Sequence, residues 1–393
     1  MRPLATATSA TVSSDSAALV RRASPLCLLS VCLRRRRRPP LIWGFSPSDE
    51  ADAEFQRYLS LAAGSGGSVL ETQRAYTSLG IFYQERVQTA TEETPPLRRA
   101  EWLNQAETYY RKSLELVQQT GVPEPEQIGL VADANLHLGN VHELRGDPNQ
   151  AIKLYEVALR LYGSAKASKM AMARVYSSLG FAHLRTRSFK DCIENFTRNL
   201  EICEEQKDPR ALSSAHSEVG DAYFQFCEYS KAVDHFEKSL QIARRYFAAD
   251  RAEVERLESN VNVSREAAEL AQEVGTLERK LGRSGSLSAD KTFEILRDIY
   301  SKLTVMNNPD KLLLCARKLV ACAGEINDAG KKLDAHACLG EALLRTEKWQ
   351  EAAKVFQEML STLRTQPQKD AELEADALGG LGRALSKLHM YAN

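Results

Sequence analysis

One spacing recurs along this sequence and constrains the fold more than any other feature. An apolar residue precedes a Gly; twelve residues after the Gly comes a small residue, four further on an aromatic, and three beyond that a third position, usually small. The four full copies are Gly139 with Ala151, Tyr155 and Ala158; Gly180 with Cys192, Phe196 and Asn199; Gly220 with Ala232, Phe236 and Ser239; and Gly340 with Ala352, Phe356 and Met359. Recurrence in one register predicts a repeat protein whose units are pairs of helices.

The physical chemistry of the spacing explains why such units must stack. A single helical hairpin cannot bury its apolar face, whereas neighbouring hairpins bury it against each other. Gly on the first helix and the small residue opening the second predict a close helix crossing. We expect the aromatic side chain to fill the groove against the next unit. The pattern is typical of the tetratricopeptide repeat (TPR), so we predict an all-α superhelical solenoid of antiparallel helical hairpins.

The ends of the predicted helices carry their own signals. Asp147-Pro148 and Asn308-Pro309 each place a capping side chain before a proline at the first helical position. Ser188 is expected to cap a second helix in the same way. The Gly positions 139, 180 and 220 lie 41 and 40 residues apart, against about 34 for the usual repeat, so the units have a long period.

The first and last units depart from the regular spacing. Leu79-Gly80 opens a unit whose second half arrives late, and we predict a loop insertion over Thr89–Arg99; that second half is Ala106, Tyr110 and Ser113. The chain stops after Leu381-Gly382, a first helix that no second helix follows. Because a solenoid needs a capping element at its end, we expect a fragment, or a further domain beyond Asn393.

These patterns divide the chain as follows. Residues 1–50 form a disordered leader and 51–248 the TPR array, with units at about 71–120, 130–165, 172–207 and 212–247. Residues 249–285 have a narrow apolar stripe among many charges, which predicts long linking helices. Residues 288–393 hold a degenerate repeat, one regular repeat at 332–367 and a truncated final unit.

The leader has a composition unlike the rest. Its first 48 residues contain eight Arg and one acid, Asp15, with an unbroken Arg34–Arg38 run. Charge on the C-terminal side of the short apolar stretch Leu26–Leu33 is the wrong polarity for a secretory signal. An organelle transit peptide for a mitochondrion or plastid, a nuclear import signal, and a basic tail or sequence upstream of the true start all fit.

Composition and motifs exclude several classes of function. Lys plus Arg and Asp plus Glu number 52 each, so no net field favours nucleic acid or an acidic membrane, and no apolar run reaches the ~18 residues of a membrane span. The eight Cys have no CxxC spacing, the seven His no HExxH, and no phosphate-binding or nucleophile motif occurs. We predict no enzyme, no cofactor, no metal and no small-molecule substrate.

What remains is a surface for other proteins. In a TPR superhelix the first helices line the concave face, and fixed positions of each repeat point into it. We expect a mixed groove suited to an extended or helical segment of a partner. Its predicted residues are Asp133, Asn140 and Glu143; Arg174, Phe181 and Arg185; Asp221, Phe224 and Gln225; and Asp334, Glu341 and Arg345. Any one of these residues also fits an ordinary solvated helix face.

The order of irregular features resembles that of one family. Leu138-Gly139-Asn140 is similar to the long-period repeats of spindle-orientation adaptors, but residues 70–390 more closely resemble the TPR region of Tonsoku-like proteins. The features are an opening helix at 71–76, an insertion before 106–114, three regular repeats, a long helix near 250–280, a degenerate unit, and Leu-Gly-Glu-Ala-Leu at 339–343. The resemblance implies a nuclear scaffold in replication-fork repair and chromatin, with histone chaperones and replication factors as partners. The ankyrin, acidic and leucine-rich regions of that family are lacking here, and a cytoplasmic TPR adaptor stays open.

Overall fold

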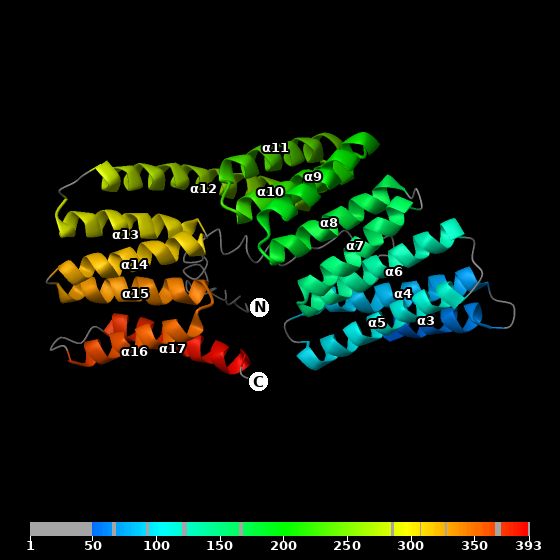
Figure 1. Cartoon of the computed structure of the whole chain (residues 1–393), viewed down its shortest axis with the longest axis horizontal. Helices are drawn as coiled ribbons and strands as arrows, with labels where there is room; N and C mark the ends of the chain where they lie inside the picture. The colour runs from blue at the N-terminus through cyan, green and yellow to red at the C-terminus, as the bar shows by residue number, and fades with distance from the viewer. Residues whose placement is uncertain are drawn as a thin grey trace, which may run out of the picture. The chain divides into compact units, whose positions relative to one another are not determined.

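The computed structural model describes residues 49–64, 68–91, 94–119, 124–164, 168–283, 287–306, 308–326, 328–365 and 371–391. All regular structure in these ranges is α-helical, as the repeat spacing predicts (Figure 1). The helices are α3 (Asp49–Ala62), α4 (Val69–Thr89), α5 (Pro96–Gln119), α6 (Glu124–Arg145), α7 (Pro148–Ser164), α8 (Lys169–Arg185), α9 (Phe189–Gln206), α10 (Pro209–Gln225), α11 (Tyr229–Tyr246), α12 (Arg251–Arg283), α13 (Ala289–Val305), α14 (Pro309–Glu325), α15 (Ala329–Arg345), α16 (Trp349–Thr365) and α17 (Ala371–Tyr391). The predicted leader, residues 1–48, lies outside the described residues.

The helices form two compact units whose boundary falls inside α12, between Val261 and Asn262. The first unit holds four hairpins, α4–α5, α6–α7, α8–α9 and α10–α11, with α3 packed on α4. Each second helix also packs on the first helix of the next hairpin, and the first helices contact one another in succession. In the other unit α13–α14 and α15–α16 form hairpins and α17 packs on α16 and α15. Both units are therefore stacks of helical hairpins, the solenoid architecture.

The repeated Gly makes room for the aromatic ring of its own hairpin. A Cβ added at Gly139 would lie 2.4 Å from Tyr155 Cε1, and one at Gly180 would lie 2.5 Å from Phe196 Cδ1. Carbon atoms pack at about 3.5–4.0 Å, so no larger side chain fits. The same contact recurs at Gly80 with Tyr110, Gly220 with Phe236, and Gly340 with Phe356.

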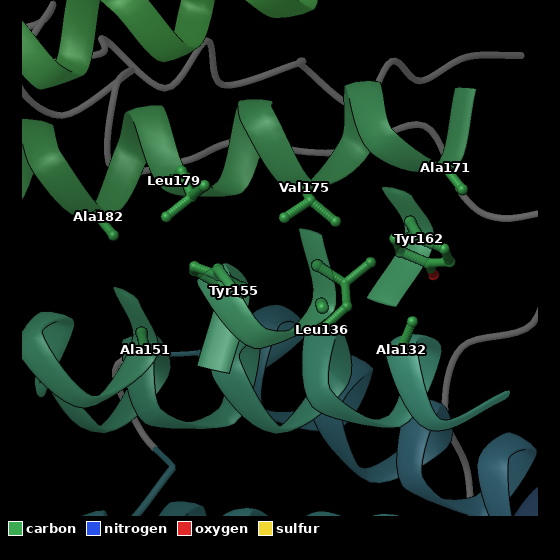
Figure 2. Close-up of a cluster of buried hydrophobic side chains, with 10 residues drawn as sticks. Ala132, Leu136, Ala151, Tyr155, Tyr162, Ala171, Val175, Leu179 and Ala182 are labelled. Atoms are coloured by element: carbon green, nitrogen blue, oxygen red, sulfur yellow. The ribbon is translucent and has the colours of Figure 1, made fainter. Parts of the chain in front are cut away.

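The expected role of the aromatic was therefore incomplete, because the ring serves both its own unit and the next one. Tyr155 is fully buried in a cluster that includes Leu136 of α6 and Val175 and Leu179 of α8. Figure 2 shows its ring between the helices of its own hairpin and α8. The aromatic side chain thus holds the two helices of its hairpin together and packs the hairpin on the next one. Gly on the first helix leaves the space that this large ring needs.

The degenerate hairpin α13–α14 reverses these sizes. Ile299 stands 41 residues before Gly340, and Cys315 stands 41 before Phe356. Both are buried. A large residue on the first helix and a small one on the second fill the same space, since cores tolerate changes that conserve volume.

The first hairpin corrects the predicted loop insertion over Thr89–Arg99. Thirty residues separate Gly80 from Tyr110, against sixteen between Gly139 and Tyr155. Most of the added length is helical, because α4 continues to Thr89 and α5 already begins at Pro96. The extensions are held together by stacking: the Arg86 guanidinium lies 4.6 Å from the Trp102 ring centroid, within cation–π range.

Helix termini follow the capping signals with one exception. The Asp147 carboxylate accepts from Gln150 N–H at 3.1 Å, and Asn308 Oδ1 accepts from Lys311 N–H at 3.1 Å. Ser188 precedes α9, but its side chain makes no capping hydrogen bond; its hydroxyl instead accepts from the Thr186 hydroxyl at 3.3 Å. The expected Ser188 cap was wrong: the Ser188 hydroxyl bonds to the Thr186 hydroxyl and not to the first N–H groups of α9.

Four hairpins share one turn between their helices. One residue, which is the first or second residue after the end of the first helix, has a left-handed backbone conformation. The N–H of the residue that follows it donates to the carbonyl five residues earlier, as from Asp147 to His142 and from Lys348 to Leu343, both at 3.0 Å. This is the Schellman arrangement, in which Gly is preferred. The left-handed residues are Gly146 (φ 87°), Arg187 (φ 58°), Cys227 (φ 64°) and Glu347 (φ 60°). Three of the four turns therefore carry backbone strain that Gly avoids.

Candidate partner-binding face

Polar side chains join the first helices α6 and α8 in one unit, and α13, α15 and α17 in the other. We call these two groups of side chains the polar row. The hydroxyl of Tyr155, on α7, donates to two acceptors on α6: Asn140 Oδ1 at 2.8 Å and Glu143 Oε2 at 3.0 Å. The Tyr162 hydroxyl donates to the Asp133 carboxylate. Burial is the main cause that raises the pKa of Tyr162, and this hydrogen bond to Asp133 raises it further. Second-helix tyrosines thus hold the predicted α6 residues in fixed orientations.

The predicted residues of α8 reach back to α6. Arg174 Nη2 lies 3.6 Å from Asp133 Oδ1, while the Arg174 side chain remains 62% exposed. Arg185 Nη1 donates to the Glu143 carbonyl at 3.0 Å. Because that carbonyl belongs to the last turn of α6, Arg185 satisfies a group that the helix leaves without an internal partner. Phe181 is half-buried and meets Phe196 edge-on, with ring centroids 4.7 Å apart.

On α10 only one of the three predicted groove residues is exposed. Gln225 is exposed, whereas Asp221 and Phe224 are buried. Phe224 packs edge-on against Tyr229, with centroids 5.4 Å apart. The expectation that Asp221 and Phe224 offer their side chains to a partner therefore needs correction: here the first-helix face turns inward, and the Phe224 ring is used for packing within the hairpin.

The second unit repeats the arrangement with different residues. Arg297 Nε donates to Asp334 Oδ2 at 2.8 Å. Glu341 accepts from Arg345 at 3.3 Å and from Arg383 at 3.1 Å. Arg345 Nη1 donates to the Thr304 carbonyl at 3.0 Å, in the last turn of α13. Arg345 thereby caps a carbonyl in the last turn of α13, as Arg185 caps one in the last turn of α6.

Sequence reasoning missed the partners that organise these residues. Tyr155 and Tyr162 lie on second helices, and Arg297 and Arg383 on first helices of neighbouring hairpins. One signal was available: an Arg stands five residues after Gly180 and after Gly340. Position alone, however, does not say that its acceptor is a carbonyl of the preceding first helix.

A related ion-pair group joins the first two hairpins. Glu107 on α5 accepts from Arg111 at 2.6 Å and from Arg145 on α6, and Arg145 also donates to Asn104 at 2.7 Å. Burial raises the pKa of Glu107, but the hydrogen bonds from the two arginines outweigh it and hold that pKa below its usual value. The carboxylate is thus charged at neutral pH and links both hairpins.

Two histidines meet inside the fourth hairpin. His216 Nδ1 and His235 Nδ1 lie 3.2 Å apart, and the Tyr223 ring stacks at a tilt beside His235. Burial lowers the pKa of His216 to about 4, assisted by the nearby His235 and Lys238. Burial also lowers the pKa of His235. A hydrogen bond between the two imidazoles requires at least one neutral ring, because the accepting nitrogen carries no proton. Burial disfavours the charged form of both rings.

Within the described ranges, no three His, Cys, Asp or Glu side chains lie close enough together to hold a metal ion. None of the helices described is both long and apolar enough to cross a lipid bilayer. The polar side chains of the row bond to one another and to helix ends. This geometry presents oriented hydrogen-bond donors and acceptors, together with a few half-buried aromatic rings, to another chain.

Parts of the chain match models of known repeats. Residues 171–245 match one model described as tetratricopeptide repeat, and residues 136–165 and 335–371 match a second with the same description. No curated protein matches the sequence significantly.

Several solved structures are similar to the chain at low identity. BtubC (BKLC) from P. vanneervenii is 14% identical over 75% of this chain and 91% of its own, with a TM-score of 0.36. The apo form of RapI is 13% identical over 81% and 99%, with a TM-score of 0.41. Aspartyl phosphate phosphatase F from Bacillus subtilis is 12% identical over 81% and 66%, with a TM-score of 0.46. At this overlap the likenesses carry no argument about function.

Proposed function

We propose that this tetratricopeptide-repeat chain is a non-enzymatic scaffold that binds extended or helical segments of partner proteins on its first-helix face. The supporting observation is the row of polar side chains bonded across successive first helices. Tyr155, Tyr162 and Arg185 hold their neighbours in place. A surface whose rotamers are already fixed loses little conformational entropy on binding.

The row also offers both signs of charge at exposed and half-exposed positions. Asp133 lies beside Arg174, and Asp334 beside Arg297. Such pairs at the surface contribute about 0–1 kcal/mol to stability, so a partner that exchanges bonds with them costs the fold little. Specificity for one partner then depends on matching the order of charges along the row.

A charge reversal on this face tests the proposal. The tagged full-length chain, its Arg174→Glu variant and a Lys190→Glu control are used to capture interacting proteins. Arg174 is exposed on first helix α8 and Lys190 is exposed on second helix α9, so both variants keep the fold. We expect Arg174→Glu to lose captured proteins that wild type and Lys190→Glu retain. Identical sets from all three would reject the first-helix face as the binding surface.

For the partner class we propose a Tonsoku-like role in replication-fork repair and chromatin assembly, with histone chaperones and replication factors bound in a nucleus. Its support is the sequence resemblance: the extended first hairpin, the long helix at 251–283 and the degenerate pair at 289–325 occur in the same order. Capture from a nuclear extract tests it. Recovery of an unrelated partner and no replication or chromatin protein would reject this part and leave the scaffold proposal standing.

A second candidate is an adaptor of an unrelated pathway in an organelle or the cytoplasm, favoured by the Arg-rich, acid-poor residues 1–48. Residues 1–48 fused to a fluorescent reporter decide this point, with a fusion whose Arg34–Arg38 run is changed to Gln as control. An organelle signal lost in the control supports the second candidate, whereas a nuclear or diffuse signal removes the organelle option.

A further inference from the structure

Helix α17 is a first helix whose own second helix is missing from the described residues. Gly382 stands 42 residues after Gly340, in the place of the repeated Gly. A Cβ at Gly382 would meet no neighbouring atom within 4 Å, whereas each counterpart would strike a ring. Leu378 and Leu385, four residues before and three after it on the same face, are 48% and 39% exposed. In the five described hairpins with the repeated Gly, the space beside it holds an aromatic ring. The corresponding space beside Gly382, which we call the seat, is open.

Helix α3 is the complementary case, a second helix whose first helix is not among the described residues. Phe55 lies 25 residues before Gly80, as Tyr155 lies 25 before Gly180. Phe55 packs on Phe82 of α4 at 5.3 Å between ring centroids, and Phe82 follows Gly80 by two residues. Tyr155 makes the matching contact with the cluster of α8. α3 therefore sits on α4 as every second helix sits on the next first helix.

The free side of α3 is apolar. Tyr58 and Leu61, three and six residues after Phe55, are 39% and 71% exposed. Their counterparts on α7 are Ala158 and Leu161, and both pack in the cluster that α7 shares with α6. The exposed face of α3 is thus the face that meets the first helix of the same hairpin in a complete unit.

The side-chain sizes on these two open faces match. In the first hairpin, Ser113 stands three residues after the aromatic and contacts Thr77 and Gln73, with oxygen or nitrogen atoms 3.2 and 3.1 Å from its hydroxyl. The counterpart of Ser113 on α3 is the much larger Tyr58. The counterparts of Thr77 and Gln73 on α17 are Gly379 and Ala375. A larger side chain on one helix faces smaller ones on the other, which conserves volume.

Charge favours the same antiparallel pairing. The early part of α3 carries Glu54 and its middle carries Arg57, both exposed. α17 has the reverse order, acidic at Glu374 and Asp376 and basic at Lys387. In an antiparallel hairpin Glu54 lies toward the basic end of α17 and Arg57 toward its acidic end. The acidic early part of α3 then faces the basic half of α17.

We propose that α3 of one copy docks on α17 of a second copy and completes its hairpin, with Phe55 over Gly382 and Tyr58 over Gly379. The two surfaces differ, so the contact is heterologous and each copy retains one free seat and one free α3. Association is head to tail and grows with concentration. This surface shares helix α17 with the polar row, where Arg383 bonds to Glu341, but the docking does not depend on partner binding at that row.

Sedimentation velocity of the full-length chain from about 1 to about 100 µM, a range that spans micromolar dissociation constants, tests the proposal. We expect wild type to form larger species as concentration rises. Gly382→Leu fills the seat, and the double variant Tyr58→Glu with Leu61→Glu places charge on the docking face of α3. Each should sediment as a single copy. The controls Gly275→Leu, where a Cβ also meets nothing within 4 Å, and Ser60→Glu, an exposed site on α3, should associate like wild type.

Mixing the variants identifies the head-to-tail geometry. Gly382→Leu retains a working α3, and the α3 double variant retains a working seat. An equimolar mixture should therefore form one contact and stop at a dimer, although neither variant associates alone. A monomeric wild type at every concentration, variants that associate as strongly as wild type, or a mixture that stays monomeric would each overturn the proposal. Unchanged helical circular dichroism of each variant shows that the fold is intact.

Discussion

The pairing of a repeated Gly with an aromatic ring predicts the effect of adding one methyl group. In Gly180→Ala, the new Cβ lies 2.5 Å from both Cδ1 and Cε1 of Phe196, about 1 Å inside normal carbon contact. The Phe196 ring has no free direction to move, because it is fully buried and meets Phe181 edge-on at 4.7 Å. Relief requires the two helices of the hairpin to separate.

Two opposing terms set the magnitude. Overpacking a well-filled core costs about 1–3 kcal/mol, whereas replacing Gly by Ala within a helix stabilises it by about 0.5–1 kcal/mol. The net result is a loss of about 0–2.5 kcal/mol, with a central value of about 1 kcal/mol. Each kcal/mol lowers the melting temperature by about 2–4 °C for a cooperative unit of this size. Gly180→Leu, with a larger clash, should cost a few kcal/mol.

Thermal unfolding of the full-length chain, followed by helical circular dichroism, measures the effect. Gly275→Ala is the matched control: Gly275 lies in the middle of α12, where a Cβ meets nothing within 4 Å, so the control should be stabilised. Phe196→Leu in the Gly180→Ala background should recover part of the loss, since a smaller side chain relieves the clash. A Gly180→Ala variant that melts at or above the control would refute the proposed contact.

Three further outcomes follow from the structure. Arg187→Gly should raise the melting temperature by relieving a left-handed residue, worth about 1 kcal/mol, and Gly146→Ala should lower it by a similar amount; the reverse order would contradict the turn assignment. Burial holds the pKa of His216 at about 4, below its unfolded value of about 6.5, so its stabilising contribution is complete above pH 6.5 and is lost as pH falls toward 4; urea unfolding at several pH values should show a shallower dependence in His216→Gln. Burial raises the pKa of Cys192 to about 12, so iodoacetamide at pH 8 should label half-buried Cys227 before it, and equal rates in the folded chain would contradict this burial.

Much of the fold was predictable because its signals are local. The spacing from Gly180 to Phe196 places two contacting residues on the two helices of one hairpin, and it recurs often enough to distinguish it from chance. Capping at Asp147 and Asn308 depends on the next three residues alone. Where a competing local bond exists, as at Ser188, the same reasoning fails.

The candidate binding face was only partly predictable. Asp133, Asn140 and Arg174 are where the repeat register places them, on the first helices, but Asp221 stands at the same repeat position as Asn140, one residue after the Gly, and is buried. Register gives the side of the helix on which a residue lies. It does not give the packing of α10 against its neighbours, which decides whether the side chain reaches solvent.

The sequence by itself determined that paired helices form and that small residues face large ones, because helix periodicity and side-chain volume act within about forty residues. Only the tertiary structure decided which distant atoms meet: that Arg185 ends α6 by bonding the Glu143 carbonyl, that Arg345 does the same for α13, and that the seat at Gly382 stays open. Those contacts depend on how each hairpin is rotated on the one before it. That rotation is set jointly by all the side chains packed between two hairpins, so no single spacing contains it.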